Sequence, residues 1–136
     1  PRAGGHTCRT LLGRTLPHPL LRARGALHRA VHADGELGVA CAASAQQAGL
    51  VLSTQASTPL ESVAHAIRND TDRGPLWMQM YLQHDRGFNT EFVRRIEAAG
   101  YEALVLTVDA PCSGVRDRER RAGPAAPPGV SSTIVV

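Results

Sequence analysis

Three apolar segments of the sequence each end in polar side chains whose types suit a common site. The segments are GLVLST at 49–54, PLWMQMY at 75–81 and LVLTVDAP at 104–111, and the polar residues near their ends are Ser53, Gln79, Tyr81, Thr107 and Asp109. Alternate residues of a strand share one face, so Gln79 lies with Tyr81 and Thr107 with Asp109. Hydroxyls, an amide, a phenol and a carboxylate can hydrogen-bond the edge of a planar heteroaromatic cofactor that supplies the reactivity, and a flavin fits this description.

The elements that must position these residues are strands separated by helices. We predict strands over Leu50–Ser53, Leu76–Tyr81 and Ala103–Val108, with a weaker first strand within 20–26. One helical pattern lies between each pair of successive strands, which is the arrangement of βαβ units in a parallel sheet. Ligands of such sheets bind beyond the C-terminal ends of the strands. Each polar residue alone could merely satisfy loop backbone groups, but their occurrence on three strands favours a binding site.

Local signals set the expected helix boundaries. Asp34 can cap a helix in which Glu36 suits the positive end of the dipole and which Gly49 ends. The segment Thr58-Pro59-Leu60-Glu61 combines a capping box with proline at the first helical position. Asn89 or Thr90 can cap a third helix that ends at Gly100. In the strand between these last two helices, the pattern places Leu76, Met78 and Met80 toward the helices and Trp77 on the face of Gln79.

The domain organisation follows from these elements. Residues 1–19 form an approach segment without a sustained period, and 11–21 suggests short extended pieces joined by X-Pro turns. Residues 20–111 hold the β/α units, and 112–136 form a charged and proline-rich loop. The fold class is therefore α/β. Because a closed (β/α)₈ barrel takes about 250 residues, we expect this chain to cover roughly its first four units.

Composition excludes several classes of protein. With 43% hydrophobic and 20% charged residues the chain can form a packed core. The net charge of +3 is spread along the chain and aromatic residues are only 4%, which argues against a nucleic-acid-binding protein. The arginines at 116–121 alternate with Asp117 and Glu119, so a solvated loop is favoured there over a nucleic-acid site. Three cysteines without CxxC spacing indicate neither a disulfide framework nor a zinc site. No membrane span or signal peptide is recognised, so we expect a cytoplasmic protein.

Longer segments carry a resemblance to a known family. They are HADGE at 32–36, LSTQAS at 52–57, WMQMYLQHDRGF at 77–88, EAAGYEALVLTVDAP at 97–111 and GVRDRERR at 114–121. In order and spacing they resemble the FMN-dependent α-hydroxy acid oxidases and dehydrogenases, the group of glycolate oxidase, lactate dehydrogenase and mandelate dehydrogenase. This resemblance implies a TIM barrel that oxidises an L-2-hydroxy acid to the 2-keto acid and passes a hydride equivalent to FMN.

The resemblance also implies roles for single residues. Ser53, Gln79 and Thr107 match residues that hydrogen-bond the flavin ring, and Ala26 matches the end of a turn whose backbone faces the flavin. Tyr81 matches a tyrosine that stabilises developing charge near the substrate. Arg116 matches an arginine that pairs with the substrate carboxylate, for which a guanidinium fork is suited. Asp109 matches the aspartate that orients the catalytic histidine.

Two departures from the family pattern set further expectations. The first-strand turn is usually Pro-x-Ala, whereas this chain has Arg24-Gly25-Ala26. The family's catalytic histidine and phosphate-binding loops come from the second half of the barrel, and the histidines here, at positions 6, 18, 28, 32, 65 and 84, lie in other segments. We therefore expect the N-terminal half of an enzyme, inactive alone. The alternative is a non-catalytic half-barrel that self-associates as a homo-oligomer or pairs with another chain, covering its open sheet edges.

Overall fold

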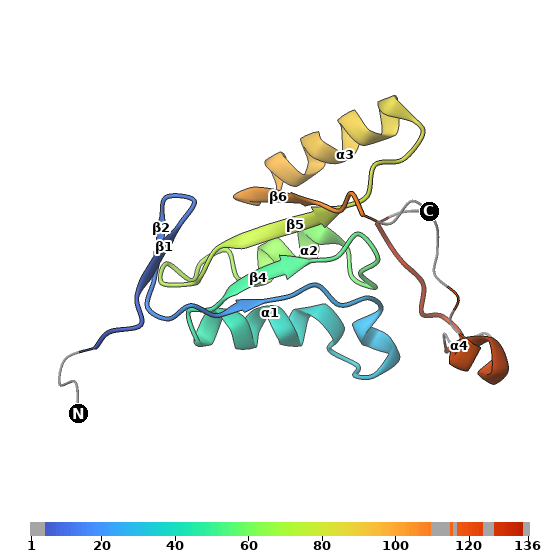
Figure 1. The fold of residues 1–136 in the computed structure, drawn as a ribbon, viewed down its shortest axis with the longest axis horizontal. Coiled ribbons are helices and arrows are strands. Elements are labelled where there is room, and N and C mark those ends of the chain that lie inside the picture. The colour runs from blue at the N-terminus through green and yellow to red at the C-terminus, as the bar shows by residue number, and fades with distance from the viewer. Residues whose placement is uncertain (1–4, 110–114, 116, 124–126, 135–136) are drawn as a thin grey trace.

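A computed structural model describes residues 5–109, 115, 117–123 and 127–134. In this part of the chain a parallel sheet of four strands has the order β3-β4-β5-β6, and α1, α2 and α3 connect successive strands (Figure 1). The strands of this sheet are β3 (Leu21–Arg22), β4 (Gly49–Leu52), β5 (Leu76–Met80) and β6 (Ala103–Leu106). The helices are η1 (His28–Ala30), α1 (Gly35–Ala45), α2 (Leu60–Ala66), α3 (Arg86–Ala98) and α4 (Asp117–Ala122). The predicted α/β class and the strand–helix alternation are confirmed.

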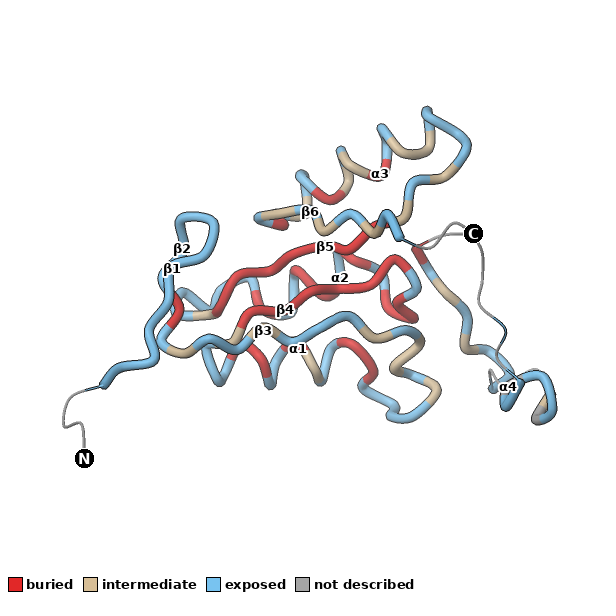
Figure 2. The backbone as a smooth tube through the Cα atoms, in the orientation of Figure 1, coloured by how far each residue is buried: buried red, intermediate tan, exposed pale blue. Residues whose placement is uncertain are grey.

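The two central strands, β4 and β5, are buried along their whole length (Figure 2). Leu76, Met78 and Met80 belong to the apolar core that the helices cover, as the alternation predicts. Trp77 and Gln79 are also buried but lie on the opposite face of β5. The sheet thus has a helix-covered outer face and an inner face that presents Gln79.

Asp85 caps α3, so the predicted cap at Asn89 or Thr90 was wrong. The Asp85 carboxylate accepts hydrogen bonds from the N–H groups of Gly87 and Phe88 at 2.7 and 3.2 Å, and the helix begins at Arg86. Asn89 lies inside the helix and exchanges two hydrogen bonds with the Gln83 backbone. Asp and Asn are equally good caps, and the apolar spacing alone did not distinguish them.

The predicted capping box at the start of α2 is also wrong. Pro59, rather than Thr58, occupies the position before the first helical residue, and α2 has no side-chain cap. The Thr58 hydroxyl donates instead to Glu36 at 2.7 Å. Asp34 does precede α1, but it too makes no capping bond, and α1 ends at Ala45 rather than continuing to residue 48.

A β-hairpin that the sequence did not predict lies beyond the N-terminal ends of the sheet strands (Figure 1). Its strands, β1 (Arg9–Leu11) and β2 (Arg14–Leu16), pair antiparallel. Leu12 and Gly13 form its turn with positive φ angles of 46° and 78°, which glycine adopts readily. Arg14 anchors the hairpin by donating to the Arg73 carbonyl at 3.0 Å and pairing with Glu102 at 3.5 Å.

The last strand of the sheet, β6, is partly uncovered. It pairs with β5 in a register that aligns Leu104 with Met78 and Leu106 with Met80. Both leucines therefore lie on the outer face, yet they are 44% and 45% exposed. The strand ends at Leu106, two residues earlier than predicted. Within the segment predicted as a charged loop, Asp117–Ala122 forms the short helix α4.

Tyr101 connects the core to α2 through its hydroxyl group. Removal of this hydroxyl is expected to lower the stability of the fold. Its hydroxyl donates to the Leu60 carbonyl at 2.9 Å, and burial together with the nearby Glu61 charge raises the pKa of the phenol, which stays protonated. Tyr101→Phe removes this bond and keeps the ring, so we expect a loss of about 1 kcal/mol in unfolding free energy, measured by urea denaturation. An unchanged unfolding midpoint would contradict the bond.

Candidate functional site

Three of the residues predicted to share a site are joined by hydrogen bonds at the C-terminal ends of β4, β5 and β6. Gln79 lies in the middle: its Oε1 accepts from the Ser53 hydroxyl at 3.4 Å, and its Nε2 donates to the Thr107 hydroxyl at 3.0 Å. We call Ser53, Gln79 and Thr107 the strand-end triad. The parallel register places them together, because Gln79 aligns with Val105 and Thr107 follows two residues later on the same face.

The loop that follows β4 is held against the same glutamine. The Thr54 N–H donates to Gln79 Oε1 at 3.3 Å, and the Thr54 hydroxyl donates to the Gln79 carbonyl. The Ser53 hydroxyl accepts from the Gln55 N–H at 3.1 Å. The side chain of Gln79 is fully buried, and Ser53 and Thr54 are nearly so. These bonds fix both the loop and the orientation of the amide, with its oxygen toward β4 and its nitrogen toward β6.

Among the described residues, Tyr81, Asp109 and Ala26 make no hydrogen bond to this triad. Tyr81 directly follows β5 and its side chain is half-buried, while Asp109 is exposed beyond β6. Ala26 is exposed in the turn before η1, where the next residue, Leu27, has a positive φ of 50° and donates its N–H to the Gln55 carbonyl at 3.1 Å. Arg116 lies outside the described residues.

The donor set of the triad suits the edge of a flavin ring. Such an edge carries both carbonyl and N–H groups, so it needs partners that can donate and accept. A hydroxyl has one proton and two lone pairs, and an amide has two protons and two lone pairs, so all three residues keep capacity for a further partner. The half-exposed Thr107 is the member that solvent reaches most readily.

Glu36 is a buried residue that the sequence interpretation assigned only to the helix dipole. It is 1% exposed, and its carboxylate accepts from the Ser57 N–H at 2.8 Å, the Ser57 and Thr58 hydroxyls, and the His28 N–H at 3.1 Å. Burial favours the protonated form. The hydrogen bonds from Ser57, Thr58 and His28 together outweigh burial and lower the pKa of Glu36.

Glu36 should therefore contribute to acid denaturation. Its folded pKa lies below the ordinary value of 4.5, so the ionised group stabilises the fold above pH 4.5 and loses this contribution as the pH falls through the folded pKa. Glu36→Gln cannot gain this proton. We expect its unfolding free energy to fall less steeply than that of the wild type below pH 4.5, measured by urea titration at several pH values. Parallel pH profiles for both proteins would contradict this expectation.

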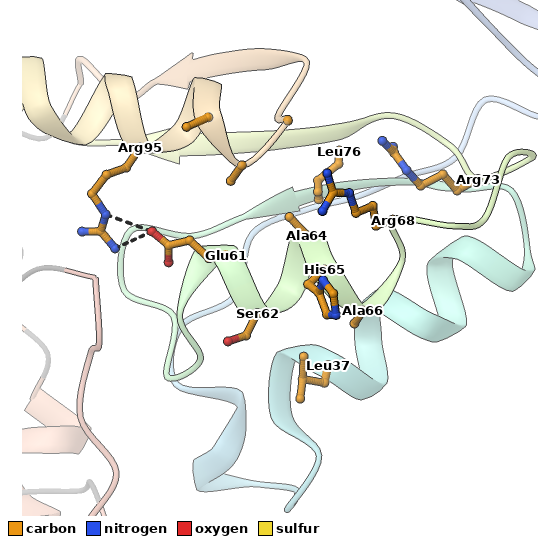
Figure 3. A pocket seen from close by; sticks show the side chains of 13 residues that line it. Leu37, Glu61, Ser62, Ala64, His65, Ala66, Arg68, Arg73, Leu76 and Arg95 are labelled. Carbon is orange, nitrogen blue, oxygen red and sulfur yellow. Dashed lines mark hydrogen bonds and ion pairs between the residues drawn. The ribbon is translucent and has the colours of Figure 1, made fainter.

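A groove of about 890 Å³ lies elsewhere, between α2 and α3 on the helix-covered side of the sheet (Figure 3). Arg95 and Glu61 form an ion pair of 2.9 Å along it, and Arg68 and Leu76 also line it. No member of the strand-end triad lines this groove. It is therefore separate from the candidate site.

A metal centre and a membrane-spanning helix are both absent from the described part of the chain. No group of three or more His, Cys, Asp and Glu side chains there could hold a metal ion. Cys8 and Cys41 are free and exposed. None of the described helices combines the length and the apolar character needed to cross a bilayer.

The chain is similar to known sequences over most of its length. The pattern of a family described as FMN-dependent dehydrogenase matches residues 2–136. An L-lactate oxidase of Roseobacter sp. (strain GAI101) is 46% identical over 123 residues, which cover 90% of this chain and 32% of that protein. An L-lactate dehydrogenase of Xanthomonas campestris pv. campestris (strain B100) is 40% identical over 117 residues, covering 86% of this chain and 29% of that protein.

Solved structures give the same result. A crystal structure of mandelate oxidase with (S)-2-phenylpropionate matches with a TM-score of 0.86 and 36% identity, covering 95% of this chain and 37% of that one. A tyrosine-to-phenylalanine variant of mandelate oxidase, solved with a C4a-OH-FMN adduct, matches with a TM-score of 0.85 and 35% identity, covering 95% of this chain and 37% of that one. The chain thus spans about a third of the length of the relatives it matches.

Proposed function

Because the chain belongs to the FMN-dependent dehydrogenase family, we propose that it supplies the flavin-ring side of a site that oxidises an L-2-hydroxy acid to the 2-keto acid. Its four sheet strands form part of a TIM barrel, the fold of its structural neighbours. FMN is the cofactor of this family and accepts the hydride equivalent when bound. The relatives' names, L-lactate oxidase and mandelate oxidase, suggest small hydroxy acids as substrates.

The observation that carries the proposal is the strand-end triad. Three strands, separated in the sequence by two helices, bring Ser53, Gln79 and Thr107 into one hydrogen-bonded row. The row lies at the strand ends where parallel α/β folds bind ligands. We assign these three residues to the edge of the flavin ring, and the exposed Ala26 turn to its neighbourhood.

The substrate side is assigned to residues that follow the triad. Tyr81, two residues after Gln79, would donate a hydrogen bond to the developing charge on the substrate oxygen. Arg116 would bind the substrate carboxylate in two parallel hydrogen bonds. Asp109 would orient and charge-balance a histidine base. That histidine is taken to lie in a segment corresponding to the rest of the relatives' length.

FMN binding tests the proposal directly. We expect addition of the 136-residue chain to quench FMN fluorescence in a saturable manner, and Thr107→Val to weaken the binding, because it replaces a hydroxyl of the triad by a methyl group of similar size. Thr90→Val is the matched control, because Thr90 lies on α3 and its hydroxyl donates only to the Arg86 carbonyl. Equal affinities for both variants, or no quenching by the wild type, would contradict the assignment.

Turnover by the 136-residue chain alone should be negligible. General-base catalysis contributes roughly 10²–10⁴-fold, and none of the histidines of this chain matches the family's base. When L-lactate or L-mandelate is added without oxygen, we expect the flavin absorption band at about 450 nm to bleach no faster than it does for free FMN. Reduction faster than that of free FMN would show that the chain holds its own base and would refute this prediction.

A second candidate function has one observation in its favour. The exposed leucines 104 and 106 on the edge strand β6 form an apolar surface that a partner could cover. A non-catalytic half-barrel that pairs with a second copy would use this surface. Light scattering distinguishes the two cases, because this candidate requires a compact dimer that Leu104→Glu dissociates.

A further inference from the structure

Glu36 is a buried side chain that connects the two segments that follow the neighbouring strands β3 and β4. On one side it accepts a hydrogen bond from the His28 N–H at the start of η1. On the other it accepts from the Ser57 N–H and hydroxyl and from the Thr58 hydroxyl, just before α2. A single buried carboxylate therefore joins the turn at 24–28, which holds Ala26, to the loop at 53–58, which begins with Ser53.

The two segments make few other polar contacts with each other. The Leu27 N–H donates to the Gln55 carbonyl at 3.1 Å, and the Arg29 N–H donates to the Ser57 hydroxyl at 3.1 Å. That hydroxyl in turn donates to Glu36. The described residues place no ion-pair partner beside Glu36, so its buried charge is balanced by N–H and O–H donors alone. A side chain too short to reach these donors would leave the buried N–H and O–H groups without partners, which costs free energy.

The loop at 53–58 is also fixed from its other side. Thr54 bonds to Gln79, and the Thr133 N–H donates to the Ala56 carbonyl at 3.0 Å. The loop is thus a fixed reference, whereas the turn at 24–28 has two exposed residues, Arg24 and Ala26. Apart from the pairing of β3 with β4, the turn is held to the loop by Glu36, by the Leu27 N–H and, just after the turn, by the Arg29 N–H.

We propose that Glu36 is a positioning residue that sets the distance between the turn at 24–28 and the loop at 53–58, and thereby the width of the flavin-edge site. The inference rests on the proposed function, because it takes Ala26 and Ser53 as neighbours of the flavin. It concerns the reach of the side chain rather than its charge. A glutamine reaches as far and can accept from both N–H groups, whereas an aspartate keeps the charge but is shorter by one carbon–carbon bond, about 1.5 Å.

Comparison of Glu36→Gln with Glu36→Asp separates these two properties. Amide hydrogen exchange is followed by NMR at His28 and Ser57 and, as an internal reference, at amides of β5. We expect Glu36→Asp to speed exchange at His28 or Ser57 on the order of tenfold relative to β5, and Glu36→Gln to change it by less. Ser44→Ala is the matched control, because Ser44 is buried at the opposite end of α1 and bonds to Asp70 at 2.6 Å.

FMN affinity gives the second readout. We expect the FMN dissociation constant to rise on the order of tenfold for Glu36→Asp, and to stay close to the wild-type value for Glu36→Gln and Ser44→Ala. The proposal is overturned if Glu36→Asp keeps the slow amide exchange and the FMN affinity of the wild type while Glu36→Gln loses both. The charge of the side chain, rather than its reach, would then matter. Exchange that rises equally in β5 also overturns it, because the role is then general stability. A wild type that does not bind FMN contradicts the proposed function, and exchange alone then decides the role of Glu36.

Discussion

Gln79→Met is expected to abolish the strand-end triad and with it most of the affinity for FMN. Methionine is close to glutamine in length but can neither accept from the Thr54 N–H nor donate to Thr107. Leaving such buried groups unsatisfied costs about 1–3 kcal/mol of unfolding free energy. If Gln79 also contacts the flavin, FMN affinity should fall by an amount on the order of a hundredfold, because a bond to the ring and the arrangement of two neighbours are lost together.

The control for this variant is Gln46→Met, which makes the same change at an exposed position just after α1. Urea denaturation and fluorescence titration with FMN measure the two effects separately. Titrations are made well below the unfolding midpoint, so that a weaker affinity does not simply report unfolded protein. A Gln79→Met chain that is destabilised but binds FMN as the wild type does would show that Gln79 has only a structural role.

The triad could be predicted from sequence because its positions follow from strand periodicity. Ser53, Gln79 and Thr107 each lie near the end of an apolar segment, and parallel strands bring such ends to one edge of a sheet. The buried outer face of β5 followed from the same alternation. Patterns with a two-residue period are local in the sequence, so no knowledge of tertiary contacts was needed.

The contacts of Glu36 could not be predicted in this way. Its partners Ser57 and Thr58 lie 21 and 22 residues away in the sequence, and its position in the first turn of α1 already had a sufficient local explanation in the helix dipole. The capping box predicted at Thr58 was wrong for the same reason, a contact between residues that are distant in the sequence. A local pattern assigned the Thr58 hydroxyl to the N-terminus of α2, whereas a stronger charged acceptor from another helix binds it.

The hairpin of β1 and β2 was missed for a different reason. Its strands have only three residues each, too few for an alternating pattern, and its turn uses Leu12 with a positive φ, which is uncommon for a non-glycine residue. Arg14 fixes the hairpin to Arg73 and Glu102, which are distant in sequence. Short elements that depend on such anchors give little local signal.

Phe92→Ala is expected to have the largest effect on stability and to disturb the site from a distance. Phe92 is 2% exposed and is one of only two buried residues of α3, the other being Ile96. Removal of a buried phenylalanine side chain costs about 3–5 kcal/mol, because both the transfer free energy and the contacts around the cavity are lost. This is a large part of the roughly 5–15 kcal/mol of a typical domain.

The consequence for the site follows from the chain order. The helix α3 leads directly into β6, whose leucines 104 and 106 are half-exposed, so β6 depends on β5 and on the docking of α3 for its position. Loosening of α3 should therefore move Thr107 away from Gln79. We expect urea denaturation to show the destabilisation and amide exchange to rise first in α3 and β6. Phe88→Ala is the control, because the Phe88 ring stacks on Phe92 with 5.9 Å between the ring centroids but is only half-buried. A loss of unfolding free energy in Phe88→Ala as large as that in Phe92→Ala would contradict this account of the core.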